Sequence, residues 1–154
     1  MRVLLLCLAA CAAPRPVVVA DRISPVEVTS WEGTPTTLGA RAAGRPMVVD
    51  LFATWCDTCR EQIPALNQLA RKHGERLLVI GVDVGERRSE VETQLRNFGI
   101  EYPVVFDAEF RFADSLGVSQ LPMMLLVDRD GVIRHRARTL DAASAKAIDE
   151  LVGP

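Results

Sequence analysis

Two cysteines with two residues between them, Cys56 and Cys59, are the side chains of this sequence best suited to chemistry. A thiolate attacks a disulfide bond, and a second thiol one helical turn away can resolve the mixed disulfide by forming an intramolecular bond. Cys56 is predicted to be the acidic, exposed nucleophile and Cys59 the resolving thiol. The spacing therefore predicts thiol-disulfide exchange.

A static disulfide and half of a zinc site are the alternatives for this cysteine pair. Structural zinc sites use four ligands, and the two histidines, His73 and His135, do not stand at the spacing of a zinc finger. Redox exchange is the preferred interpretation because the cysteines stand between a predicted strand and a predicted helix. We expect no metal site, and no cofactor besides the redox-active disulfide itself.

The residues on either side of the cysteines predict the elements that hold them. The apolar run 48–52 is typical of a short strand buried on both faces of a sheet. From Asp57 onward the apolar residues recur at steps of three and four, which is typical of an amphipathic helix. Cys56 would stand at the start of that helix, where free backbone N–H groups stabilise a thiolate. The charge of Asp57 acts against this effect, and the sequence leaves the net sign open.

Asp50 lies within the same apolar run. An unpaired carboxylate is costly to bury, so the pKa of Asp50 should rise. A carboxylate with a raised pKa can accept the proton of Cys59 when that thiol attacks the mixed disulfide. The alternative is an aspartate at a strand end that binds backbone groups.

The segment from Trp55 to Cys59 resembles the active-site motif of the thioredoxin superfamily. Asp50, six residues before the first cysteine, and Pro64, five residues after the second, extend the match. The resemblance covers roughly residues 25 to 152 and is strongest to the exported TlpA/ResA/CcmG-like thiol-disulfide oxidoreductases. It implies an α/β fold: a thioredoxin-like three-layer sandwich with a mixed central β-sheet flanked by helices, an extra βα insertion and an N-terminal hairpin.

The same resemblance implies a substrate-binding site beside the cysteines. Pro122 would be a cis proline that lies against the motif, and Leu121 before it would offer backbone groups to a substrate chain. Trp55 would cover one side of the thiols. An ordinary turn proline before a strand is the alternative for Pro122. Relatives that act in cytochrome c maturation often carry a glutamate three residues after the second cysteine, where this sequence has Gln62.

Hydrophobic periodicity and turn residues predict an alternation of strands and helices. A strand at 26–31 would pair with 36–38, and the helix after the cysteines would be interrupted at Pro64, because proline lacks the N–H donor. The basic run 134–138 is interpreted as the solvated face and end of an edge strand. The other predicted strands are 77–84, 102–106, 123–127 and 132–136, and the other predicted helices are 89–98, 109–116 and 142–151.

The N-terminus resembles an export signal of the lipoprotein type. Residues 1–10 contain one arginine and an apolar run, and Cys11 follows small residues as the lipidated cysteine of such a signal does. A cleaved signal without a lipid is the alternative. We expect a signal at 1–10, a linker at 11–25 and one thioredoxin-like domain at 26–154, which suits 154 residues with 49% hydrophobic content.

Taken together, these features predict a thiol-disulfide oxidoreductase on the periplasmic side of the bacterial cell envelope, anchored to a membrane by lipid. It would act on protein thiols and disulfides, more as a reductant than as an oxidant, with a DsbD/CcdA-like membrane electron donor. A net charge of -2 gives no reason to expect nucleic acid binding. The alternatives are a copper metallochaperone and a non-catalytic binding module. A thiol peroxidase ranks behind them, because peroxiredoxins carry a threonine where Ala53 stands.

Overall fold

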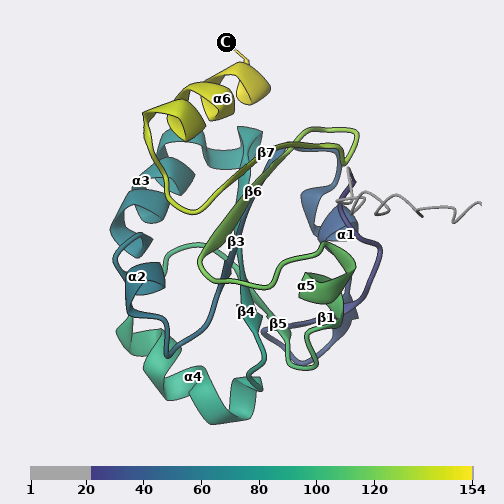
Figure 1. Ribbon diagram of the computed structural model, residues 1–154, viewed down its shortest axis with the longest axis vertical. Coiled ribbons are helices and arrows are strands. Elements are labelled where there is room, and N and C mark those ends of the chain that lie inside the picture. The colour runs from purple at the N-terminus through teal and green to yellow at the C-terminus, as the bar shows by residue number, and fades with distance from the viewer. Residues whose placement is uncertain (1–21, 154) are drawn as a thin grey trace, which may run out of the picture.

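The computed structural model of this protein describes residues 22–153. Within these residues the chain forms one seven-stranded mixed sheet in the order β2-β1-β5-β4-β3-β6-β7 (Figure 1). The central strands β3 (Met47–Phe52) and β4 (Leu78–Val84) are parallel, and β6 (Met123–Val127) runs antiparallel to β3. This confirms the predicted mixed central sheet.

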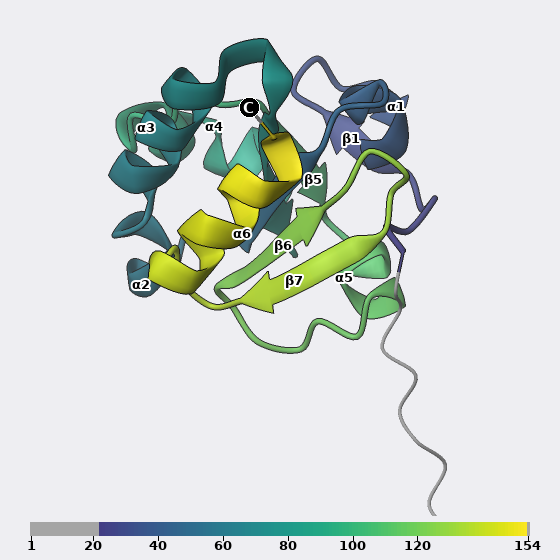
Figure 2. The same ribbon diagram turned by 90° about the horizontal axis from the view of Figure 1, so that it is seen from above.

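The outer strands extend the sheet on both sides. β5 (Val104–Asp107) is parallel to β4, and β1 (Val28–Ser30) runs antiparallel to both β5 and β2 (Pro35–Thr36). The predicted N-terminal hairpin is therefore present. At the other edge β7 (Ile133–Ala137) pairs with β6 as a hairpin, which Figure 2 shows side by side.

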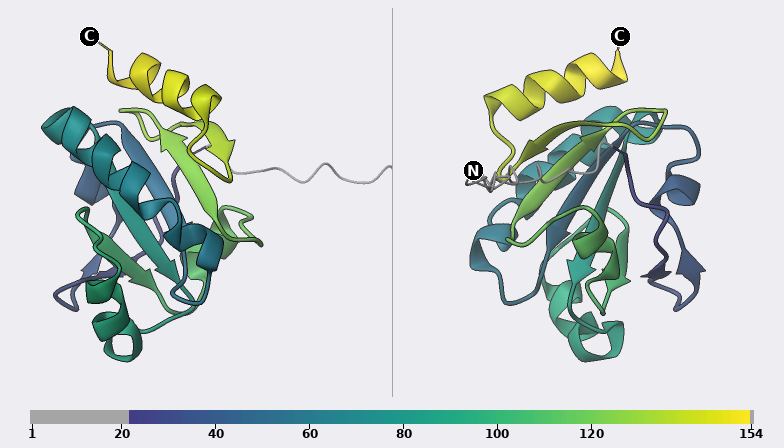
Figure 3. Two further views of the ribbon diagram at one scale, coloured as in Figure 1. Left: turned by 90° about the vertical axis from the view of Figure 1, so that its left-hand side faces the viewer. Right: turned by 45° about the vertical axis from the view of Figure 1, so that its right-hand side comes forward.

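Two groups of helices cover the two faces of the sheet, so the predicted three-layer sandwich is confirmed (Figures 1 and 3). One face carries two short helices, whose side chains share a core cluster with the odd-numbered residues of β3. The other face carries four helices and the cysteine pair. The first group is α1 (Leu38–Ala42) and α5 (Arg111–Ser115); the second is α2 (Asp57–Arg60), α3 (Ile63–His73), α4 (Arg88–Asn97) and α6 (Ala142–Val152).

The helix after the cysteines is divided as the sequence predicts. α2 ends before Glu61 and α3 begins at Ile63, so that Pro64 falls in the first turn of α3, where no N–H is needed. Gly74 ends α3 with a positive φ of 52° and leads into a short 3₁₀ helix, η1 (Gly74–Arg76). The insertion of β5 and α5 between β4 and β6 is also as expected, whereas α1 is a helix that the sequence pattern did not predict.

Most of the expected leader and linker lies outside the described residues, and so does Cys11. Residues 22 and 23 already contact the domain, because Arg22 forms a β-bridge with Val132 and the Ile23 N–H donates to the Gly131 carbonyl at 2.8 Å. Both residues stand before the expected domain boundary at 26. Between residues 22 and 153, no helix is both long enough and apolar enough to cross a membrane.

Candidate active site

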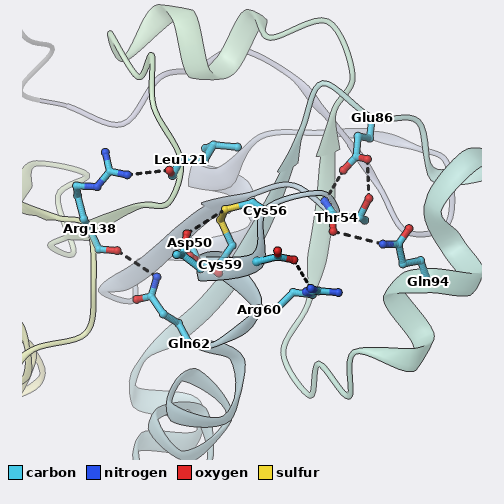
Figure 4. The surroundings of a disulfide bond; sticks show 12 residues. Asp50, Thr54, Cys56, Cys59, Arg60, Gln62, Glu86, Gln94, Leu121 and Arg138 are labelled. Atoms are coloured by element: carbon cyan, nitrogen blue, oxygen red, sulfur yellow. Dashed lines mark hydrogen bonds and ion pairs between the residues drawn. A yellow bond between two sulfur atoms is a disulfide. The ribbon is translucent and has the colours of Figure 1, made fainter.

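Cys56 and Cys59 are joined by a disulfide bond, with 2.07 Å between the sulfurs and 5.3 Å between the Cα atoms (Figure 4). Cys56 is the residue that precedes α2, and Cys59 lies within that helix. The Cys59 N–H donates to the Cys56 carbonyl at 3.1 Å, which holds the two residues in a single turn. The strand-to-helix position predicted for the pair is therefore correct, and the two sulfurs are close enough to cycle between dithiol and disulfide.

The prediction of an exposed Cys56 is wrong for this disulfide form. Cys56 is 6% exposed and Cys59 is 2% exposed, because both lie in an apolar cluster. The cluster also contains buried side chains from β3, β5 and α4: Phe52, Val91, Leu95, Val104 and Phe106. Cys56 remains the more accessible of the two cysteines.

Two polar groups beside Cys56 bear on its charge. The Thr58 hydroxyl lies 3.6 Å from the Cys56 sulfur, within hydrogen-bonding range for sulfur. The carboxylate of Asp57 forms an ion pair with Arg60 at the protein surface. The negative charge that the sequence placed next to the nucleophile is thus balanced by a guanidinium, and Thr58 supplies a donor that the sequence analysis did not consider.

The peptide bond between Leu121 and Pro122 is cis, as predicted. Pro122 is buried, and the Leu121 side chain packs against the apolar cluster that holds the cysteines. Trp55, which was expected to cover the thiols, is 69% exposed and borders a surface groove together with Leu121. The structure therefore brings Leu121, the residue before the cis proline, to the cysteine cluster and leaves most of Trp55 in solvent.

Asp50 is buried in β3, with only 2% of its surface exposed. Loss of water raises the pKa of Asp50 to about 7, and a hydrogen bond from the Tyr102 hydroxyl to Oδ2, at 3.4 Å, opposes part of this rise. Alternation along β3 places Asp50 on the same face as Phe52, the face that carries the disulfide. Both the predicted burial and the direction of the pKa shift are confirmed.

Gly81 on the neighbouring strand makes this arrangement possible. It stands opposite Asp50 in the register between β3 and β4. A Cβ atom at Gly81 would lie 2.8 Å from Phe52 Cε1 and 3.2 Å from Tyr102 Cε2. The absence of a side chain therefore leaves space for the Tyr102 ring to reach the carboxyl group.

A carboxylate on the loop after β4 holds the segment that leads to the cysteines, and the sequence analysis missed it. Glu86 accepts a hydrogen bond from the Thr54 N–H and another from the Thr54 hydroxyl, both at 2.6 Å. Gln94 on α4 donates to the Thr54 carbonyl at 3.3 Å. These hydrogen bonds fix the residue that stands two positions before Cys56 (Figure 4). No spacing rule in the sequence links Thr54 with positions 86 and 94.

A second aspartate, Asp83, is buried beside this group. It is fully buried in β4, and neither of its carboxyl oxygens has a hydrogen-bond partner among the described residues. Burial raises the pKa of Asp83 to about 8, and the neighbouring Glu86 adds to the rise. The only available signal in the sequence was an acid inside a strongly apolar strand, the signal that singled out Asp50.

Gln62 joins the junction of α2 and α3 to the segment that follows β7. Its amide nitrogen donates to the Arg138 carbonyl at 3.1 Å, and its amide oxygen accepts from the Leu140 N–H at 3.1 Å. A glutamate, which relatives often carry here, has no N–H to donate when ionised. Gln62 therefore has a structural role in this protein that an acid at the same position could not fill.

Across 22–153, no group of three or more His, Cys, Asp and Glu side chains is arranged to hold a metal ion. The cysteine pair itself lies in an apolar cluster, with the Thr58 hydroxyl in hydrogen-bonding range of the Cys56 sulfur. What the arrangement can do chemically is exchange a disulfide, with a protonatable carboxyl group on the same face of the sheet.

Comparisons with known proteins agree with this geometry. Residues 19–136 match the AhpC/TSA family. The thiol-disulfide oxidoreductase ResA of Geobacillus thermodenitrificans is 31% identical over 94 residues, which are 59% of this chain and 53% of that protein. The thiol:disulfide interchange protein DsbE of Allochromatium vinosum is 34% identical over 94 residues, which are 60% of this chain and 51% of that protein. The chain thus spans about half the length of the curated relatives it matches.

The fold is shared with solved structures of similar proteins. The thioredoxin domain of a thiol-disulfide oxidoreductase from Bacteroides vulgatus superimposes with a TM-score of 0.75 at 17% identity, covering 86% of this chain and 96% of that one. At this identity the match concerns the fold alone. By its family match and its architecture, the chain belongs to the AhpC/TSA family and has a thioredoxin-like fold.

Proposed function

We propose that this protein is a thiol-disulfide oxidoreductase that exchanges disulfides with other proteins through Cys56 and Cys59. The observation that carries the proposal is the disulfide between these residues at the start of α2, with the Leu121 side chain packed against the same apolar cluster. The names of the relatives, a thiol-disulfide oxidoreductase and a thiol:disulfide interchange protein, support the same reaction class.

The reaction begins with the reduced protein. The Cys56 thiolate attacks one sulfur of a partner's disulfide, and the other partner sulfur leaves as a thiolate that takes up a proton. Cys59 then loses its proton and attacks the Cys56 sulfur. The Cys56–Cys59 disulfide forms, the mixed disulfide breaks, and the second partner thiolate leaves and is protonated. Two electrons pass to the partner, which ends as a dithiol.

Asp50 is proposed to receive the proton of Cys59 in the second step. Its pKa of about 7 allows the carboxyl group to hold or release a proton near neutral pH. Its position on the face of β3 that carries the disulfide supports this role. Leu121 and Pro122 would bind the partner's chain beside the disulfide, and Trp55 would contact the partner from the rim of the groove that it shares with Leu121.

The reductant direction is proposed because the side chains around Cys56 offer few groups that could bind a thiolate. Its neighbours in the cluster are apolar, and within residues 22–153 the one side-chain hydrogen bond to its sulfur is that of the Thr58 hydroxyl. A reduced form that is poorly stabilised makes a dithiol a stronger electron donor. Equilibration with glutathione buffers would test this: a reduction potential below that of glutathione supports the reductant role, and a higher one contradicts it.

Paired cysteine variants test the reaction itself. Reduced wild-type protein should reduce insulin, and Cys56→Ser should lose this activity because the attacking sulfur is gone. Cys59→Ser should instead accumulate a mixed disulfide with its partner, which a non-reducing gel displays. Insulin reduction that survives in Cys56→Ser would contradict the proposal and would favour a non-catalytic role for the cysteine pair.

We further propose that the protein works on the periplasmic side of the bacterial cell envelope, tethered to a membrane by a lipid on Cys11. The support is the signal-like pattern of residues 1–10. In an oxidising compartment a spent reductant needs a source of electrons, so a membrane donor of the DsbD/CcdA kind is proposed as its partner. Membrane fractionation of wild type and Cys11→Ser tests the tether: only the wild type should sediment with membranes.

A further inference from the structure

An arginine from the segment after β7 reaches the backbone beside the disulfide. One guanidinium nitrogen of Arg138, Nη2, donates to the Leu121 carbonyl at 2.8 Å, and Nη1 donates to Gln120 Oε1 at 2.8 Å. Figure 4 shows the Arg138 side chain directed at Leu121. Arg138 is exposed, and within residues 22–153 its guanidinium binds these neutral oxygens and no carboxylate. The positive charge on this side of the site is therefore available to another molecule.

The same arginine borders a groove of about 460 Å³ at the surface. Trp55 and Phe110, the two large hydrophobic side chains that are exposed among the described residues, stand in the lining of this groove, as does Leu121. Asp114 on α5 contributes a negative charge to the lining. An incoming chain would thus meet two aromatic rings, one carboxylate and one guanidinium next to the cysteine cluster.

Only one of the two backbone hydrogen-bonding groups of Leu121 has a partner among the described residues. In the part of the chain that the structure describes, its N–H has no hydrogen-bond partner, and its carbonyl is bound by Arg138. An extended peptide that pairs with such a segment uses both the N–H and the carbonyl. A substrate chain that pairs here therefore meets a Leu121 carbonyl oxygen to which Arg138 is already bound, and the guanidinium takes up space that the chain would use.

Building on the function proposed above, we propose that Arg138 selects substrates with an acidic residue beside the reactive cysteine. A carboxylate is a stronger acceptor for guanidinium than a neutral carbonyl, and it can be bound through two N–H groups. When Arg138 turns to such a carboxylate, the Leu121 carbonyl becomes free to accept an N–H of the same substrate chain. A neutral chain must displace Arg138 without offering it a new partner.

The backbone around Arg138 is held in place while its side chain exchanges partners. Gln62 binds the Arg138 carbonyl and the Leu140 N–H, both at 3.1 Å. Gln62 lies at the junction of α2 and α3, directly after the cysteine motif. The distance between Arg138 and the disulfide therefore changes little. Selection by Arg138 is then a matter of side-chain hydrogen bonds, with no movement of the fold.

Two disulfide-linked peptides can test this inference. They differ only at the positions flanking the cysteine, where one peptide has glutamate and the other has glutamine. We expect the reduced wild-type protein to react about 5-fold faster with the glutamate peptide at low salt, and this preference should shrink in about 0.5 M salt. Arg138→Ala should lose the preference and react faster with the glutamine peptide than the wild type does, because the Leu121 carbonyl is then free. Equal rates with both peptides for the wild type would overturn the inference.

Arg134→Ala is the matched control, because Arg134 lies on β7, the strand that leads to Arg138, and pairs with Asp128 at 2.6 Å, away from Leu121. It should keep the preference for the glutamate peptide. Loss of preference in both variants would show a general effect of surface charge and would contradict a specific role of Arg138. Failure of the wild type to react with either peptide would instead refute the proposed function, so the two ideas fail in different ways.

Discussion

Asp50 and Asp83 are buried on neighbouring strands, point to the same face of the sheet, and have different surroundings. In the register of β3 and β4, Asp50 stands opposite Gly81 and Asp83 stands opposite Phe52. Asp50 accepts a hydrogen bond from Tyr102, whereas Asp83 has no partner among the described residues and faces the charge of Glu86. Burial raises the pKa of both, to about 7 and about 8.

The difference shows that a raised pKa does not by itself identify a catalytic acid. Burial is the main cause of a raised pKa at both positions, and at Asp83 the neighbouring Glu86 adds to the rise. What separates them is position: Asp50 lies on the strand that leads into the cysteine motif, and Asp83 lies beside the group that holds Thr54. Variants of the two residues should therefore have similar effects on stability and different effects on exchange.

The largest expected effect is on stability. The pKa of Asp50 rises from an ordinary 3.8 to about 7, so between these pH values the folded protein keeps a proton that the unfolded chain releases. Stability then falls as the pH rises, by about 4 kcal/mol in total, and Asp50→Asn should remove this loss. Asp83→Asn should act in the same direction. Urea unfolding at pH 4 and pH 8 measures the effect, and a stability difference between variant and wild type that is the same at both pH values would contradict it.

The rate of thiol-disulfide exchange should distinguish Asp50 from Asp83. Asp50→Asn is expected to slow the resolving step by at least about 10-fold at pH 8, because the variant has no base to take the proton of Cys59. Asp83→Asn should stay within about 2-fold of the wild type. The wild-type rate should rise with pH through about 7, and this rise should be absent from Asp50→Asn. Stopped-flow measurement of the resolving step checks both points; equal slowing in the two variants would remove the distinction.

Of the two buried acids, only Asp83 should be affected by Thr54→Val. The variant loses the hydroxyl that donates to Glu86 at 2.6 Å, and the fold should lose about 1 to 2 kcal/mol of stability. Glu86 is then held less firmly beside Asp83, so the pKa of Asp83 should fall while that of Asp50 stays the same. Carboxyl carbon NMR shifts across a pH titration report both groups, with Thr54→Ser as the control that keeps the hydroxyl. Matching movements of the two pKa values would argue against independent surroundings.

The smallest effect is expected from Tyr102→Phe, which alters the surroundings of Asp50 alone. Removing the hydroxyl that donates at 3.4 Å should raise the pKa of Asp50 further, by less than about one unit, because a bond of this length is weak. The pH midpoint of the resolving step should move upward by the same amount. A midpoint that stays in place would show that Tyr102 does not act on Asp50.

The sequence predicted the fold closely because the central strands are continuous apolar runs. β3 and β4 are buried along their whole length, and β6 has the bounds predicted for it. The break before Pro64 and the cis bond at Pro122 were predicted as well, the first from the missing N–H and the second from the resemblance. Short elements such as α1 were missed, because five residues contain too few positions to display a helical period.

Apart from Leu121 and Pro122, which came from the family resemblance, the candidate site was predicted only where neighbours in the sequence are also neighbours in space. Cys56, Cys59 and Asp50 lie within ten residues of one another, and the sequence identified all three. The exposure of Cys56 was predicted wrongly, because the apolar side chains that cover it come from β5 and α4 as well as from β3. Arg138 was interpreted as part of a solvated strand edge, and the structure shows it bound to Leu121.

By itself the sequence determined which residues are candidates for the chemistry: a pair of thiols between a strand and a helix, and an acid in the strand before them. Only the tertiary structure decided how Thr54 is held and which guanidinium reaches the backbone beside Pro122. The physical reason is that hydrophobic periodicity is a local property of the chain, whereas these hydrogen bonds join residues 17 to 40 positions apart. Their partners meet only after the sheet has fixed the order of its strands.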